Sequence, residues 1–166
     1  MTGALRAPAM VVAAALVWLI AAAQLPGQAR LPISAVVAGA VETQPFGCTN
    51  LALEPFLLAC PGLHFHSGID LAAPAGTQVR SATAGVARVA FDPAGAGLYV
   101  TVMDGARVRI LYCHLSSALV HQGEAVQPGE VIGLVGATGL ATGPHVHFEI
   151  QVDGRSVDPA RWLATQ

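Results

Sequence analysis

The sequence contains no lysine, few charged residues and few aromatic residues. Charged side chains make up 11% of the 166 residues and aromatic side chains 5%, and every basic residue apart from histidine is an arginine. Without a lysine, the chain cannot attach biotin or lipoic acid to a side-chain amine, although its glycine- and valine-rich texture is similar to such carrier domains. A net charge of −2 without a basic run also gives no reason to expect a nucleic-acid partner.

Long apolar runs are absent except for one near the amino terminus. This run extends over residues 9–23 and follows Arg6. It is shorter than the ~20 residues of a membrane-spanning helix and suits the apolar part of a secretory signal. Ala21-x-Ala23 fits the cleavage site, and Gly27-x-Ala29 is a second candidate. An uncleaved anchor, tethering the chain to a membrane through residues 9–23, is the alternative. Either interpretation predicts that the rest of the chain is exported.

Cysteine is also scarce, at three residues. Cys48 and Cys60 lie twelve residues apart. In an oxidising compartment they are expected to form a disulfide that closes the loop between them and contributes about 2–3 kcal/mol of stability. Cys113 remains unpaired. Because no nucleophile motif surrounds it, we interpret it as a small buried apolar residue rather than a catalytic thiol.

Glycine and proline are abundant, at 18 and 11 residues, and they separate short segments with strand-like alternation. Asp104-Gly105 and Asp153-Gly154 each join two such segments, which is a strong hairpin signal. The pattern predicts an all-β fold, an antiparallel sandwich or a partly open half-barrel. Similar stretches beginning at Gly76 and Gly123 suggest two related β units. Residues 35–41 are also β-capable, and helix is expected only in the leader and in one turn at 159–163.

The most informative stretch is rich in glycine and ends in His145-Val-His147. Alternate residues of a strand face the same side, so the two histidines are expected to project together. Neutral imidazoles are good zinc ligands. His66 and Asp70 form a second pair, which a bend entering a strand would bring together. A catalytic zinc site takes three protein ligands, so His66, Asp70 and either His145 or His147 would complete it.

A further histidine, His114, ends the strand after the first hairpin. Alternation predicts that Tyr112 and His114 share one face and that Cys113 points away from them. If one histidine of the His145/His147 pair binds metal, the other and His114 would remain as neutral imidazoles. They could then act as a general base or stabilise an oxyanion.

Taken together, these motifs resemble the lysostaphin/LytM family of zinc endopeptidases, which cut the peptides of bacterial peptidoglycan. The resemblance extends from Val41 to Asp158. It rests on His66-x-x-x-Asp70, Tyr112-x-His114-Leu-Ser116, and Gly136-x-Thr-Gly139 followed by Gly143-Pro-His145-x-His147-Phe-Glu149.

The resemblance implies that Zn²⁺ is held by His66, Asp70 and His147, and that His145 and His114 are the catalytic histidines. It also implies an antiparallel β-sheet core with the site in a groove between loops. We therefore expect an exported, monomeric endopeptidase acting on peptidoglycan stem or bridge peptides. A catalytically silent module of the same fold, which regulates another wall hydrolase, is the alternative. The expected organisation is a signal peptide or membrane anchor (1–23), a linker (24–34) and a zinc metallopeptidase domain (35–166).

Two other residues near these motifs have open roles. Glu149 follows His147 on the same expected strand face and either orients a ligand histidine or lies at the rim of the groove. His64 forms a second His-x-His pattern with His66. Because the His66–Asp70 spacing already completes the expected ligand set, we do not assign His64 to the metal.

Overall fold

The structure is a computed structural model that describes residues 30–165. The leader expected at 1–23, with the tether expected at 9–23, and the first part of the linker expected at 24–34 lie outside the described residues. Within the described range, no helix is long and apolar enough to cross a membrane.

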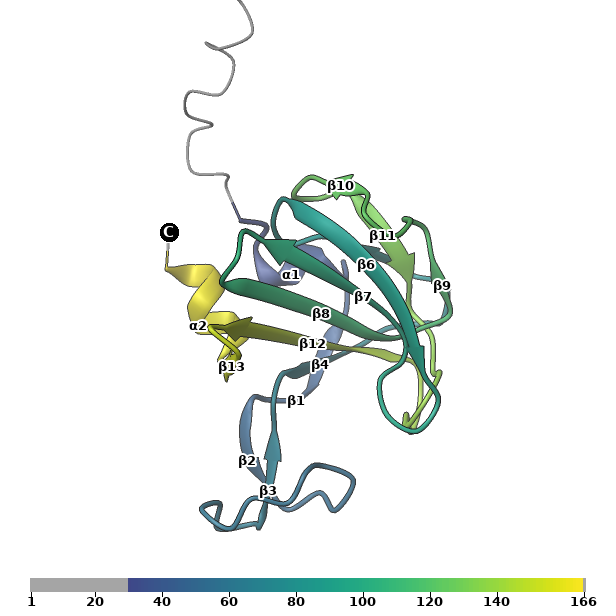
Figure 1. The fold of residues 1–166 in the computed structure, drawn as a ribbon. Helices are drawn as coiled ribbons and strands as arrows, with labels where there is room; N and C mark the ends of the chain where they lie inside the picture. Colours follow the sequence, from purple (N-terminus) through teal and green to yellow (C-terminus); the bar gives the residue numbers. More distant parts are fainter. Residues whose placement is uncertain (1–29, 166) are drawn as a thin grey trace, which may run out of the picture.

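A large antiparallel sheet forms the body of the molecule (Figure 1). Its strand order is β1 (Val41–Gln44), β4 (Ile69–Ala72), β12 (His145–Val152), β8 (Val108–Leu115), β7 (Gly97–Asp104), β6 (Gly85–Asp92) and β10 (Ala125–Val126), and β13 (Arg155–Val157) pairs with β12. A smaller sheet has the order β5 (Gln78–Arg80), β11 (Val131–Leu134), β9 (Ser117–Ala118). The prediction of an all-β, antiparallel fold is confirmed.

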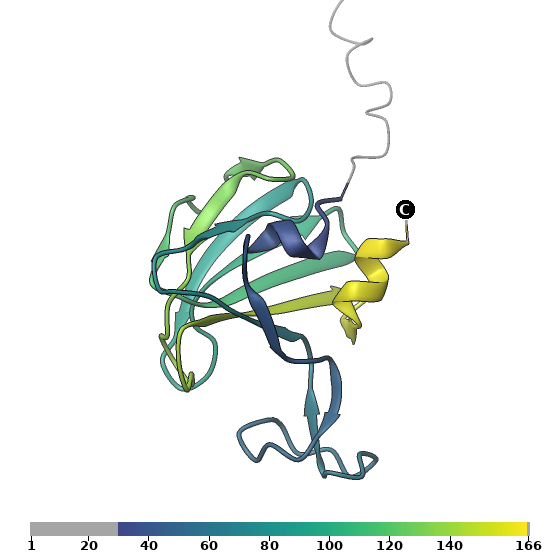
Figure 2. The same ribbon diagram turned by 180° about the vertical axis from the view of Figure 1, so that it is seen from behind.

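The apolar core lies on one face of the large sheet. Val146, Phe148 and Ile150 alternate along β12 and are fully buried, as are Ile110 on β8 and Val100 on β7. Burial of side chains of this size stabilises the fold by about 1.5–3 kcal/mol each. Helices α1 (Ile33–Val36) and α2 (Pro159–Ala164) lie on this side, where Figure 2 shows them in front of the sheet. The residues between those core positions on β12 therefore face the opposite side of the sheet.

Residues 35–41 do not form the expected strand. Helix α1 occupies Ile33–Val36, and strand β1 begins only at Val41. Pro32, with φ of −63°, precedes the helical turn, and Val36 and Val37 are buried in the core. Burial of the two valines therefore outweighs the β preference of their branched side chains. Leu31, at the end of the stretch expected as a linker, packs against the core as well.

Both predicted hairpins are present. Strands β7 and β8 pair on either side of Gly105, and β12 and β13 are joined by the two-residue turn Asp153-Gly154. Both turn residues have positive φ, 51° and 76°, as a type I′ turn requires.

A third hairpin, formed by β2 (Gly47–Thr49) and β3 (His64–His66), projects from the body (Figure 1). The predicted disulfide between Cys48 and Cys60 is present and closes the loop between these two strands. Strand β3 then leads through a short bend into β4, so this hairpin borders the start of the large sheet.

Candidate metal centre

Three predicted ligand residues meet where β3, β4 and β12 come together. Nε2 of His66 lies 3.2 Å from Oδ1 of Asp70 and 2.9 Å from Nδ1 of His147, and Nδ1 of His147 lies 3.2 Å from the same Asp70 oxygen. Asp70 and His147 are direct partners in the β4–β12 ladder, so their side chains share one face. His66 reaches them because Ser67 and Gly68 turn the chain. A Cβ atom at Gly68 would collide with the carbonyl oxygen of Phe148.

The second nitrogen of each ligand histidine faces an oxygen acceptor. Nδ1 of His66 lies 2.9 Å from the carbonyl oxygen of Pro45, and Nε2 of His147 lies 3.6 Å from Oε2 of Glu149. When the ring is neutral, such a partner holds the proton on that nitrogen and leaves the opposite nitrogen, which is directed at the cluster, free to bind a metal.

Glu149 is the buried anchor of this arrangement. Its carboxylate accepts hydrogen bonds from Ser67 Oγ (3.0 Å), Gln151 Nε2 (2.7 Å) and Ser156 Oγ (2.6 Å). Burial by itself would raise the pKa of Glu149, but the hydrogen bonds, first that of His147, lower it to about 2. Glu149 is 7% exposed, so of its two open roles, the structure favours orientation of His147 over a position at the rim.

Asp70 and His147 each stabilise the charged form of the other. Burial alone would raise the pKa of Asp70, but hydrogen bonds from His147 and His66 hold it well below its usual range. Burial alone would lower the pKa of His147, but hydrogen bonds to Asp70 and Glu149 raise it to about 9. Asp70 is therefore ionised at neutral pH, as a carboxylate ligand must be.

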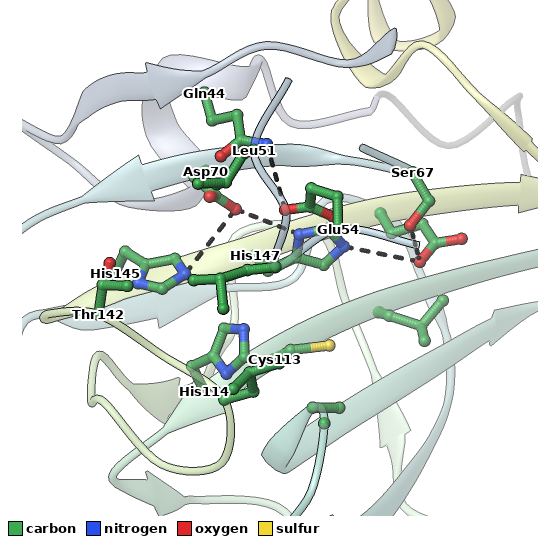
Figure 3. A pocket seen from close by; sticks show the side chains of 16 residues that line it. Gln44, Leu51, Glu54, Ser67, Asp70, Cys113, His114, Thr142, His145 and His147 are labelled. Atoms are coloured by element: carbon green, nitrogen blue, oxygen red, sulfur yellow. Dashed lines mark hydrogen bonds and ion pairs between the residues drawn. The ribbon is translucent and has the colours of Figure 1, made fainter. Parts of the chain in front are cut away.

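His145 and His114 face the same hollow but lie beside the cluster (Figure 3). Their ring centroids are 4.7 Å apart, and Nε2 of His145 lies 3.8 Å from Oδ1 of Asp70. Nδ1 of His145 donates to the carbonyl oxygen of Gly143 (2.8 Å), and Nδ1 of His114 donates to that of Thr138 (2.9 Å). Burial chiefly lowers the pKa of His114, so this ring is neutral at pH 7.

The expected sharing of one face by Tyr112 and His114 is wrong. Tyr112 is fully buried in the core, whereas Cys113 and His114 both line the hollow. The register between β7 and β8 shifts near Leu98, and His114 has a φ of 64°, in the left-handed region. This bulge interrupts the alternation and turns the His114 ring toward His145.

The hollow has a volume of about 250 Å³ and opens on the solvent face of the large sheet. Leu111 and Cys113 of β8 contribute to it, with Leu51, Leu53 and Glu54 from the loop of the β2–β3 hairpin. Cys113 is 3% exposed, in agreement with its predicted role as a buried apolar residue.

Sequence reasoning did not identify Glu54. Its Oε1 atom accepts a hydrogen bond from Gln44 Nε2 (3.1 Å) and lies 4.0 Å from Nε2 of His66. No periodicity marks this residue, although it is the one charged side chain between Cys48 and Cys60. His64 remains outside the cluster, because its Nδ1 atom bonds to the backbone carbonyl of Glu54 at 2.7 Å.

The three clustered residues fit a divalent cation. One ligand atom from each of His66, Asp70 and His147 lies within 4.8 Å of the others, and the described residues contain no other such group. Two imidazole nitrogens and one carboxylate oxygen, each supported by a further hydrogen bond or charge, form a donor set that suits zinc.

A curated relative and a solved structure show what this chain is similar to. The peptidoglycan DD-endopeptidase ShyA of Vibrio cholerae is 43% identical over 93 residues, which are 56% of this chain and 22% of that protein. The chain spans about a fifth to a quarter of the length of the curated relatives it matches. The catalytic domain of the prophage-encoded M23 protein EnpA from Enterococcus faecalis is 31% identical, with a TM-score of 0.62 over 74% of this chain and 90% of that domain.

Two further solved structures share the fold. A zinc-containing peptidase from Vibrio cholerae is 32% identical, with a TM-score of 0.66 over 81% of this chain and 40% of that one. The catalytic domain of lysostaphin from Staphylococcus simulans is 27% identical, with a TM-score of 0.63 over 76% and 93%. The resemblance to lysostaphin-type peptidases is thereby confirmed.

The sequence also matches a protein-family model. The model of peptidase family M23 covers residues 64–159, a range that includes all five histidine and aspartate positions of the candidate centre. Since this range is more than half of the 166 residues, the chain belongs to peptidase family M23.

Proposed function

We propose that this chain is a zinc-dependent endopeptidase that hydrolyses peptide bonds in bacterial peptidoglycan. The observation that carries the proposal is the convergence of five side chains, four of which line one hollow while His66 lies fully buried beside them. His66, Asp70 and His147 would be the metal ligands, and His145 and His114 would be the catalytic residues beside them.

The ligand atoms would be Nε2 of His66, Oδ1 of Asp70 and Nδ1 of His147, which already face one another. When bound, zinc supplies Lewis-acid chemistry, lowering the pKa of water and polarising a carbonyl group. The side chains of the protein would transfer the proton and orient the reacting groups.

His145 and His114 are suited to move a proton. Each donates its Nδ1 proton to a backbone carbonyl, so Nε2 carries the lone pair and is the acceptor. In the proposed reaction, such a nitrogen accepts a proton from the attacking water. The same N–H then donates that proton to the departing amine. Neutral rings at pH 7 are required for the first step, and the lowered pKa of His114 supplies one.

The proposed substrate follows from the family and the shape of the site. ShyA is named a peptidoglycan DD-endopeptidase, and the hollow of this chain opens along a sheet rather than into an enclosed cavity. We place the action of the chain outside the cytoplasm, with residues 1–23 as a signal peptide or anchor. The Cys48–Cys60 disulfide supports this, because disulfides persist in oxidising compartments.

Two histidine variants test the assigned roles. His147→Ala should lose both bound zinc and activity, because it removes a ligand. His145→Ala should retain about one equivalent of zinc but lose roughly 10²–10⁴-fold in turnover. Zinc is measured by elemental analysis after dialysis, and activity by the release of new amino termini from purified sacculi. His121→Ala, at an exposed loop histidine, is the matched control and should retain both properties.

The outcomes separate the proposed roles. Loss of zinc from His145→Ala would show that the division of roles within the pair is reversed. A wild-type protein that binds zinc and sacculi but releases no amino termini would contradict the enzyme and support the silent regulatory module.

A further inference from the structure

A second hollow lies on the same solvent face of the large sheet, beyond the metal centre. Its volume is about 480 Å³, and its lining comes from β6, β7, β8 and the loop before β10. One wall is fixed because Gln122 Oε1 accepts a hydrogen bond from the backbone nitrogen of Val89 (3.1 Å). The lining residues are Arg88, Val89, Ala90, Tyr99, Thr101, Met103, Arg109 and Gln122.

The charge of this hollow is entirely positive. Arg88 and Arg109 are its charged residues, and no acidic side chain of the described chain lines it. Within residues 30–165, neither arginine makes an ion pair or a hydrogen bond through its side chain, whereas Arg107 pairs with Asp153 and Arg161 with Asp158.

The two arginines approach a common floor. In the ladders, Arg88 is the partner of Thr101 on β7, and Arg109 is the partner of Met103 on the same strand. Thr101 is 3% exposed, so the neighbouring side chains cover it. Two arginines on the strands either side of β7, lining one hollow with no acidic residue among its described residues, match a carboxylate, which arginine binds through paired hydrogen bonds.

The second hollow continues the floor of the first. Arg109, Leu111 and Cys113 alternate along β8 and share one face, and the latter two line the hollow of the metal centre. Burial and then the charge of Glu149 raise the pKa of Cys113, whereas the charge of Arg109 lowers it. The field of Arg109 therefore reaches the metal-centre hollow.

Ladder geometry gives the spacing between the two hollows. Arg109 pairs with Gln151, four residues along β12 from His147. With ~3.4 Å per strand residue and ~4.8 Å between strands, the Cα atoms of Arg109 and His147 are about 14 Å apart. An extended peptide covers that distance with about four residues.

We propose that Arg88 and Arg109 form a carboxylate-binding subsite for the peptide that the metal centre cleaves. This inference rests on the proposed function and refines its substrate class: stem peptides with a free carboxylate on the order of 14 Å from the scissile bond, measured along the extended peptide. The glutamyl residue of a peptidoglycan stem peptide carries such a free carboxylate, and in some cell walls an amide replaces it.

The test compares two synthetic stem-peptide dimers that differ only in a free or amidated glutamyl carboxylate. The proteins are the wild type, the double variant Arg88→Gln/Arg109→Gln, and Arg155→Gln as a control at an exposed arginine on β13. For the free-carboxylate peptide, the double variant should raise KM about tenfold, with kcat and zinc content unchanged. For the amidated peptide, wild type and double variant should have equal KM values. The wild-type preference should shrink as salt increases.

Equilibrium binding keeps this inference separate from the enzyme proposal. Fluorescence anisotropy of the same labelled peptides with zinc-loaded protein reports affinity whether or not cleavage occurs. If no protein cleaves either peptide, the proposed function fails, and a tenfold loss of affinity in the double variant still supports the subsite. Equal affinity of wild type and double variant for the free-carboxylate peptide overturns the subsite, whatever the activity.

Discussion

At the scale of single residues, the orientation of each imidazole depends on the acceptor behind it. His66 has the Pro45 carbonyl, His147 has Glu149, and His114 has the Thr138 carbonyl. Glu149 differs from the others because it is charged, buried and held by three further side-chain donors. In the proposed metal centre it would therefore be a positioning residue, which acts through His147.

Glu149→Gln should weaken zinc binding about 10–100-fold, because the neutral amide no longer polarises the His147 ring. The measurement is competition for zinc with a chromophoric chelator. Glu42→Gln, at an exposed carboxylate on β1, is the control for the loss of one charge. An affinity unchanged within twofold in Glu149→Gln would contradict the positioning role.

Sequence spacing was sufficient to pair His66 with Asp70 and His145 with His147, because strand alternation and a tight bend are local rules. The choice of His147 as the third ligand came from the resemblance to the lysostaphin/LytM family, since spacing left either histidine of the pair open. Glu54 was not identifiable in this way. It approaches His66 because the loop of the β2–β3 hairpin folds back, and its carboxylate is held there by Gln44 on β1, ten residues earlier in the chain.

At the scale of elements, the glycine-rich segment before β12 holds the His114 side of the site. Thr138 accepts from His114 through its carbonyl, and its hydroxyl accepts from the backbone nitrogen of Leu98 and donates to the Leu115 carbonyl. Gly139 follows with φ of 70° and packs on Gly97, where a Cβ atom would collide with the backbone.

Gly139→Ala should destabilise the protein by about 2–3 kcal/mol, because it adds both left-handed strain and a steric clash. It should also reduce peptidase activity while zinc affinity is retained, since the ligands lie on other elements. Urea unfolding and zinc competition measure the two effects. Gly143→Ala is the control, because its Cβ would enter open space and its φ is not in the left-handed region. Equal stability of the two variants would refute this account.

The hairpins were predictable because their turn residues are local signals. The bulge at His114 and the helical turn of α1 were not, for different physical reasons. The bulge results from packing of Gly97 against Thr138, whereas α1 results from burial of Val36 and Val37. The bulge and helix α1 both depend on residues distant in sequence, so neither the alternation pattern nor β propensity predicts them.

At the scale of the whole molecule, one buried hydrogen bond joins the two sheets. The backbone nitrogen of Ala82, just after β5, donates to the hydroxyl of Tyr112 on β8 at 2.7 Å. Tyr112 is fully buried and also contacts Phe148 of β12, with ring centroids 5.3 Å apart. The side chain thus connects the small sheet to the floor of the site.

Tyr112→Phe should lower the free energy of unfolding by about 1–3 kcal/mol, because the Ala82 N–H remains buried without its acceptor. Differential scanning calorimetry and urea unfolding measure the loss. Tyr99→Phe, at a half-buried tyrosine on β7, provides the comparison and should change stability by less than about 0.5 kcal/mol. A Tyr112→Phe protein as stable as Tyr99→Phe would show that the two sheets do not depend on this bond.

The two ends of the described chain meet on one side of the body. Arg30 donates to the carbonyl oxygens of Trp162 (2.8 Å) and Thr165 (3.1 Å), and its guanidinium stacks over the Trp162 ring at 3.4 Å. The β2–β3 hairpin, beside the metal centre, lies at the opposite end (Figures 1 and 2). A bead, label or fused protein attached next to either residue 30 or residue 165 would therefore sit on the side away from the candidate metal centre, and immobilised protein should still reach a polymer as bulky as an intact sacculus.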